Sequence, residues 1–183
     1  MRAAYTSAVV VKMLGLGWEF PHVSGISAGS SLTVNYISRD PERTRRSFTD
    51  FVADPRFGNL GTWLAGRGYF DAEYIYQQIC YPDGVLPFNM DTFLANPATT
   101  RVATFNASRG EERWFSKEEM STLDALGPIV RASSTLPILM PPVEIDGDTY
   151  VDVLGIDGYN WGAVPGHRWT PPAELFSDSF AQL

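Results

Sequence analysis

The sequence predicts a single-domain α/β fold, on three observations. Residues 2–40 suggest, in order, a helix, a short strand, a tight turn and a second helix, which is what a layer of parallel α/β structure requires. Residues 101–116 and 141–152 each alternate around a turn signal, which predicts two antiparallel hairpins. The length of 183 residues, 44% of them hydrophobic, is sufficient for one domain with a substantial core.

The first elements follow from local composition. Residues 2–14, "RAAYTSAVVVKML", contain no helix breaker and are followed by glycines at 15 and 17, so we expect a helix there. Its centre is apolar on nearly every face, which suits a helix packed against a sheet. The short segment "HVSGI", residues 22–26, favours a strand, and "SSLTVNYISR", residues 30–39, favours a helix that ends at Asp40 and Pro41.

The later elements are shorter. Residues 70–79, "FDAEYIYQQI", predict a helix capped by Asp71. Residues 121–135, "STLDALGPIVRASST", predict another helix that breaks at Pro128 and resumes. In the second hairpin the pair Asp146-Gly147 is typical of a tight turn.

Composition excludes several classes of function. With 21 acidic and 14 basic residues, the net charge of −7 argues against binding to nucleic-acid phosphates and favours small or neutral ligands. Cys80 is the only cysteine, so no internal disulfide is possible, and we expect a buried small side chain rather than a reactive thiol. No stretch approaches the roughly 18 apolar residues of a membrane span, and no signal-peptide pattern is visible. A soluble cytoplasmic protein is therefore expected.

The pattern Gly25-Ile26-Ser27-Ala28-Gly29 lies between the predicted strand and the second helix. A strand-turn-helix elbow projects its serine from a strained turn, and the helix N-terminus behind it stabilises developing negative charge. We expect glycine at 25 and 29 because a side chain at either position would crowd the elbow. The alternative is an ordinary structural turn, since short glycine-serine turns also arise by chance.

A serine nucleophile needs a base, and the sequence offers only two histidines. His22 lies five residues before Ser27 on the same short strand, so it cannot easily fold back onto the hydroxyl. His167 lies in a tail rich in proline and glycine. The scarcity of histidine favours a Ser-Asp dyad over a Ser-His-Asp triad.

Three stretches carry a resemblance to a known family: "MRAAYTSAVV", "GLGWEFPHVSGISAGSS" and "RASSTLPILMPPVEIDGDTYVD". From residue 1 to about residue 152 the chain resembles the bacterial branch of the patatin-like phospholipases. The resemblance implies a three-layer α/β/α sandwich that hydrolyses lipid acyl esters without metal or cofactor. It also implies Ser27 as the nucleophile and Asp152 as the base.

The family carries a glycine-rich loop, G-G-G-x-R-G, whose N–H groups form the oxyanion hole. Met1 and Arg2 match the x-R of this motif, and Ala3 replaces the glycine that follows. On this resemblance we expect an incomplete sandwich that lacks the first strand and the oxyanion loop.

Residues 153–183 differ in character from the domain predicted over residues 1–152. The segment "GIDGYNWG" resembles part of the β-mannanase-like glycoside hydrolases, in which Asp157, Asn160 and Trp161 would bind a sugar. No pair of carboxylates placed for glycoside hydrolysis can be assigned. The tail is therefore expected to be a fragment unrelated to the rest of the chain.

Three hypotheses for function follow. The first is hydrolysis of a lipid or small ester by Ser27 and Asp152, at a membrane surface if the protein is peripheral. The second is a catalytically inactive fragment that binds lipid or a partner through exposed apolar surface. The third is glycan binding through tail aromatics, Tyr159, Trp161 and Trp169.

Overall fold

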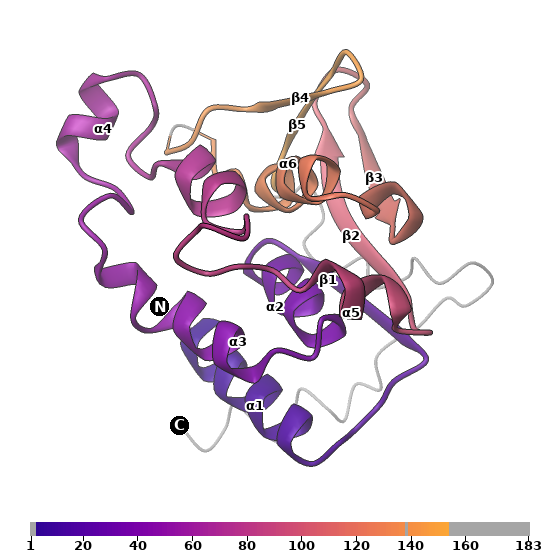
Figure 1. Ribbon diagram of the computed structural model, residues 1–183. Coiled ribbons are helices and arrows are strands. Elements are labelled where there is room, and N and C mark those ends of the chain that lie inside the picture. Colours follow the sequence, from indigo (N-terminus) through magenta and orange to yellow (C-terminus); the bar gives the residue numbers. More distant parts are fainter. Residues whose placement is uncertain (1–2, 138, 154–183) are drawn as a thin grey trace, which may run out of the picture. The chain divides into compact units, whose positions relative to one another are not determined.

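A mixed sheet of five strands organises the part of the chain that the structure describes (Figure 1). The structure is a computed structural model, and it describes residues 3–137 and 139–153. Strand β1 (His22–Ile26) runs parallel to β2 (Thr99–Asn106), and β3 (Glu111–Ser116) runs antiparallel along the opposite edge of β2. The predicted α/β class is confirmed.

Both predicted hairpins are present. β2 and β3 form the first. β4 (Val143–Ile145) and β5 (Asp148–Val151) form the second, and β5 also pairs with the end of β2. In the second turn Asp146 and Gly147 have φ angles of 51° and 84°, a conformation that Asp-Gly pairs favour in two-residue hairpin turns.

Two helices pack against the sheet and enclose the core. α2 (Ala28–Ile37) contacts β1 and β2, while α6 (Leu123–Ser134) contacts β2, β4 and β5. The two helices also contact each other, which brings the start of α2 near the end of α6. Between helices and sheet lie fully buried apolar side chains such as Ile37, Phe93, Val102, Met120 and Ala132.

Helix α1 (Ala3–Gly15) forms where predicted but does not pack on the sheet as expected. It contacts α2 and α3 (Pro41–Phe48), and Tyr5 and Val9 remain exposed. α2 contacts both β1 and β2, and α1 in turn contacts α2. An apolar circumference favours burial without specifying the partner.

The predicted break at Pro128 is also wrong, because α6 continues through it from Leu123 to Ser134. Buried residues on both sides of the proline, Leu126 and Ile129 among them, hold the helix against the core. Tertiary packing therefore outweighs the loss of one backbone hydrogen bond.

The remaining described elements are short: η1 (Phe51–Ala53), α4 (Leu60–Leu64), η2 (Tyr74–Gln78), α5 (Met90–Ala95) and η3 (Glu118–Met120). The helix predicted over 70–79 is present, with η2 a π-helix and Asp71 accepting from the N–H of Tyr74. Cys80 is buried and unpaired as predicted, and burial raises the pKa of its thiol. The tail residues Asp157, Tyr159, Asn160, Trp161 and Trp169 lie outside the described part.

Candidate active site

Ser27 occupies the turn between β1 and α2 in a strained backbone conformation. Its φ and ψ angles are 56° and −131°, a region that residues with a side chain rarely adopt. Such a conformation costs roughly 1–3 kcal/mol and persists only where its surroundings impose it. The predicted elbow is present.

The two glycines of the elbow are not equivalent. A Cβ added at Gly25 would lie 2.2 Å from the carbonyl oxygen of Gly29 and 2.5 Å from Oγ1 of Thr33, so a side chain is excluded there. A Cβ at Gly29 would meet nothing within 4 Å. The steric expectation is confirmed for Gly25 and wrong for Gly29, because the Gly29 side-chain position points away from the strand.

Serines from two helices hold the backbone of Ser27. Its N–H donates to Oγ of Ser133 at 3.0 Å, and Ser133 is fully buried near the end of α6. Its carbonyl oxygen accepts from the hydroxyls of Ser30, at 2.6 Å, and Ser134, at 3.1 Å. These bonds satisfy both backbone groups of the strained residue and fix the elbow to α6.

The Ser27 side chain does not perform the usual task of a serine at this position. Ser27 is the N-cap residue of α2, where a serine hydroxyl normally accepts from a backbone N–H in the first turn. Here no such side-chain bond is formed. The hydroxyl is left for another partner, which an ordinary structural turn would not require.

Asp152, the residue that the sequence pairs with Ser27, directly follows β5 and is 3% exposed. Its N–H donates to the carbonyl oxygen of Thr135 at 2.9 Å, which places it beside the end of α6. Burial raises the pKa of the Asp152 carboxyl above its usual value, and the Ser27 hydroxyl opposes this shift as a hydrogen-bond partner. Ser27 and Asp152, which lie 125 positions apart in the sequence, are thus both bonded to the end of α6.

One carboxylate oxygen, Oδ1 of Asp152, is buried and has no hydrogen-bond partner among the described residues. An unpaired buried oxygen disfavours the charged form, in line with the raised pKa of this carboxyl. A carboxylate that retains free accepting capacity beside a hydroxyl is suited to take a proton from it.

Tyr76, on the π-helix η2 that contacts α6, is a further candidate residue near this site, and sequence reasoning missed it. Burial raises the pKa of its phenol, the hydroxyl of Ser134 opposes that shift, and the charge of Asp152 adds to it. The Tyr76 side chain therefore lies near Ser134 and Asp152. The available signal was its position within "YIYQQ", since π-helical turns gather at functional sites, but that turn type is not readable from sequence.

With this geometry in place, the comparison with known families is decisive. Residues 1–158 match the family model described as patatin-like phospholipase, which is most of the chain. The chain belongs to the patatin-like phospholipase family. A comparison with curated protein sequences gave no match.

Other predicted site residues of this patatin-like chain lie elsewhere. Met1 and Arg2, the expected remnant of the oxyanion loop, are outside the described residues, and Ala3 is the first residue of α1. His22 is exposed at the end of β1 opposite to Ser27, so it does not reach the hydroxyl. His167 is outside the described residues.

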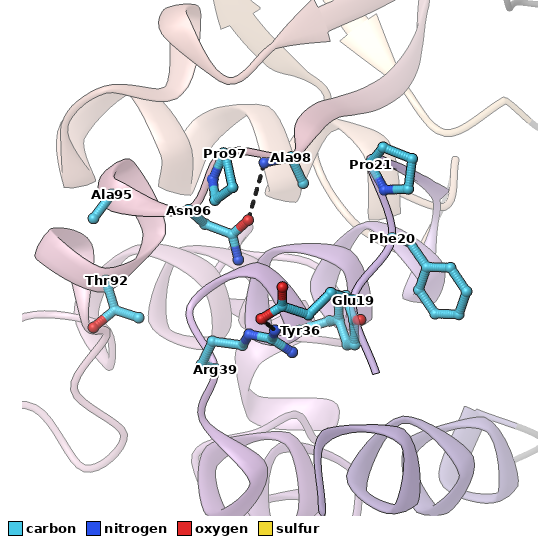
Figure 2. A pocket seen from close by; sticks show the side chains of 10 residues that line it. All are labelled: Glu19, Phe20, Pro21, Tyr36, Arg39, Thr92, Ala95, Asn96, Pro97 and Ala98. Carbon is cyan, nitrogen blue, oxygen red and sulfur yellow. Dashed lines mark hydrogen bonds and ion pairs between the residues drawn. The ribbon is translucent and has the colours of Figure 1, made fainter. Parts of the chain in front are cut away.

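A hollow of about 540 Å³ lies away from this site, next to the start of β1 and β2 (Figure 2). Phe20 and Pro21 line it just before β1, and Ala98 just before β2, whereas Ser27 follows the other end of β1. Its polar groups bind one another: Arg39 pairs with Glu19, and Asn96 accepts from the N–H of Ala98. These pairings leave little polar capacity for a ligand.

Within residues 3–137 and 139–153, no cluster of three or more His, Cys, Asp or Glu side chains is placed to hold a metal ion. None of the helices described is both long enough and apolar enough to cross a bilayer.

Proposed function

We propose that this chain hydrolyses acyl esters of lipids, with Ser27 as nucleophile and Asp152 as base. Membership of the patatin-like phospholipase family supports the general class of lipid acyl hydrolase. The observation that supports the residue assignment is the state of Ser27, a strained N-cap serine whose hydroxyl makes no capping bond to its helix, at the same end of α6 to which the buried Asp152 is bonded.

The proposed reaction has two halves. Asp152 takes the proton of the Ser27 hydroxyl while Oγ attacks the ester carbonyl carbon, and the tetrahedral intermediate then expels the alcohol, which receives that proton. Water, deprotonated by Asp152, next attacks the acyl-serine ester. This step releases the carboxylic acid and returns the proton to Ser27.

The negative charge that forms on the carbonyl oxygen needs donors. The first N–H groups of α2, at Ala28 and Gly29, have no partner within their own helix and lie at its positive end. We assign them the stabilisation that the described part of the chain supplies. The resemblance adds Arg2 and its neighbours as further candidates.

Turnover of a short-chain nitrophenyl ester tests the proposal. The unchanged chain is compared with Ser27→Ala, Asp152→Asn and a control, Ser24→Ala, in which an exposed serine of the same strand is removed. We expect the first two variants to lose at least about 10³-fold in turnover, since nucleophile and base act together, and the control to retain it. Equal turnover in all four would overturn the assignment.

The competing hypothesis, an inactive chain that only binds lipid or a partner, makes a different prediction. A fluorophosphonate probe labels a serine only when its hydroxyl is activated. We expect labelling that disappears in Ser27→Ala and persists in Ser24→Ala. A chain that binds lipid but takes up no label at Ser27 would establish the competing hypothesis instead.

A further inference from the structure

Residues 56–70 form an excursion whose end is unusually apolar. Its helix α4 carries Leu60, Trp63 and Leu64, which are 73%, 43% and 85% exposed. We call these three residues the apolar tip. Figure 1 shows α4 on a loop that extends away from the sheet. Large apolar side chains exposed together mark a surface that another apolar phase is suited to cover.

The excursion is held in shape rather than frayed. Asn59 and Thr62 form a reciprocal capping box, and Oγ1 of Thr62 also donates to the carbonyl oxygen of Tyr69 at 2.8 Å. Gly58 lies so close to the returning chain that an added Cβ would be 2.4 Å from the carbonyl oxygen of Tyr69. The tip is therefore presented by a closed and hydrogen-bonded loop.

An aromatic cluster lies at the base of the excursion, where residues 56–70 join the rest of the chain. Phe57 packs edge-to-face on Phe51 and Phe70, with ring centroids 5.5 and 5.7 Å away. Tyr74 packs on Phe51 in the same cluster, with ring centroids 5.7 Å apart. Phe57 and Phe70 are partly buried, whereas Tyr69 is 38% exposed.

The excursion is tied to the segment that carries the candidate active site. The N–H groups of Tyr69 and Phe70 both donate to the carbonyl oxygen of Leu139, at 2.8 and 3.4 Å. Leu139 follows the end of α6 by five residues and is itself 36% exposed. In the same segment the carbonyl oxygen of Thr135 binds the N–H of Asp152. The apolar tip and the base of the proposed dyad are thus anchored to one loop.

The charge of the excursion differs from that of the chain. Residues 54–71 contain two arginines and two aspartates, so this segment is neutral within a chain of net charge −7. Arg56 and Arg67 flank the tip and pair with Asp54 and Asp71 at the base of the loop, yet both guanidinium side chains remain mostly exposed. An apolar end flanked by two exposed, ion-paired guanidinium groups suits a lipid surface, where tryptophan favours the interface and arginine can reach the headgroups.

We propose that the apolar tip inserts into a lipid surface and docks the candidate active site there. The choice of lipid as the occupant rests on the proposed function, because a hydrolase of lipid esters must reach a substrate held in an aggregate. The docking itself rests on the tip, the two arginines that flank it and the connection of the excursion to Leu139.

Vesicle binding of the full chain tests the proposal. The vesicles contain phosphatidylcholine alone or with an equal amount of phosphatidylserine, and binding is measured by co-sedimentation. The tip variant is Leu60→Ser with Leu64→Ser. The matched control is Tyr5→Ser with Val9→Ser, an apolar pair on α1 whose members are 81% and 57% exposed. Thermal unfolding confirms that both variants fold.

We expect the tip variant to bind both kinds of vesicle at least about tenfold more weakly, and the control to bind as the unchanged chain does. Equal binding by the tip variant, or a loss confined to the control, would overturn the proposal. The proposal would also be overturned if size-exclusion chromatography showed the unchanged chain and the control as dimers and the tip variant as a monomer. The tip would then bind a second copy of the chain.

The same variants separate this proposal from the proposed function. Hydrolysis of a soluble short-chain ester needs no docking, so the tip variant should turn it over at the unchanged rate. Vesicle binding through the tip without any ester turnover would leave the docking intact and refute the hydrolase. Ester turnover combined with vesicle binding that does not depend on the tip would support the hydrolase and refute the docking.

Discussion

The backbone N–H of Ser27 donates a 3.0 Å hydrogen bond to the side chain of Ser133, a residue 106 positions later in the sequence. Ser134, next along α6, donates to the carbonyl oxygen of the same Ser27. The end of α6 therefore binds both the N–H and the carbonyl oxygen of Ser27, and these bonds hold Ser27 in a backbone conformation that is otherwise rare. The elbow is a joint of α2 and α6 rather than a local turn.

Substituting Ser133 tests this joint. In Ser133→Ala the N–H of Ser27 loses its acceptor inside the protein, which costs about 1–3 kcal/mol and allows the elbow to relax. We expect fluorophosphonate labelling of Ser27 to slow by at least about tenfold at a temperature where the variant is folded. Ser121→Ala, which removes an exposed serine just before α6, is the control and should label normally. Normal labelling of Ser133→Ala would contradict the joint.

The two elbow glycines should respond oppositely to alanine. Gly25→Ala places a methyl group against the backbone of Gly29, so we expect loss of labelling together with a stability loss of at least about 2 kcal/mol. Gly29→Ala meets open space in a helical first turn, and we expect stability unchanged or raised by up to about 1 kcal/mol. Urea unfolding measures both. A similar effect of the two substitutions would show that the turn is not built as described.

The raised pKa of Asp152 predicts the pH dependence of the reaction. A base must be unprotonated to accept the Ser27 proton, and burial moves the pKa of this carboxyl above its ordinary value of 3.8. Labelling should therefore fall as pH decreases through that raised pKa, where an ordinary aspartate would remain ionised. The rate of probe labelling across mildly acidic pH measures it. A rate that stays constant down to the ordinary aspartate range would argue against Asp152 as the base.

The same pKa shift predicts how the stability of the fold depends on pH. For most aspartates the contribution to stability is lost as pH falls, whereas for Asp152 it should be lost as pH rises. A carboxyl whose folded-state pKa is raised contributes stability below its unfolded pKa, and loses it as pH rises through the folded pKa. We therefore expect Asp152→Asn to gain stability relative to the unchanged chain as pH rises from the ordinary aspartate range through the raised pKa. Urea unfolding of both chains over this range checks it. A difference that is independent of pH would mean that the pKa of Asp152 is not shifted.

Tyr76 supplies a prediction about a residue outside the dyad. Tyr76→Phe keeps the ring and removes the hydroxyl near Ser134 and Asp152. We expect a several-fold decrease in kcat with little change in KM for a soluble ester, because the variant alters the surroundings of the base rather than the binding surface. Tyr5→Phe, on the exposed face of α1, is the control. An increase in KM with kcat unchanged would instead indicate that Tyr76 contacts the substrate.

The sequence predicted the parts of the fold that depend on neighbouring residues. The α1 helix, the Ser27 elbow and the Asp146-Gly147 turn follow from local composition and backbone preference, and each formed where expected. The errors concern tertiary partners. Nothing in the apolar α1 segment specifies α2 and α3 instead of the sheet, and the packing that carries α6 through Pro128 comes from distant residues.

The candidate site divides in the same way. The G-x-S-x-G motif predicts Ser27 as the nucleophile, and the family resemblance predicts Asp152 as its base. Both signals depend on residue types that the proposed chemistry requires. Ser133, Ser134 and Tyr76 act through hydrogen bonds and burial across the fold, and serine is too common a residue for its partner to be inferred from sequence. The open space at Gly29 is likewise a property of how α2 leaves the strand, which the G-x-S-x-G pattern does not encode.

The long sequence separation within this joint sets an order of events during synthesis. Ser27 leaves the ribosome well before Ser133, Ser134 and finally Asp152. Since domains are made from their N-terminal end, a nascent chain carries the proposed nucleophile for most of its synthesis without the helix that strains it or the carboxylate proposed to activate it. A hydrolase assembled in this way would be inert until almost the whole domain has emerged, so the cell would meet the reactive serine only in a folded chain.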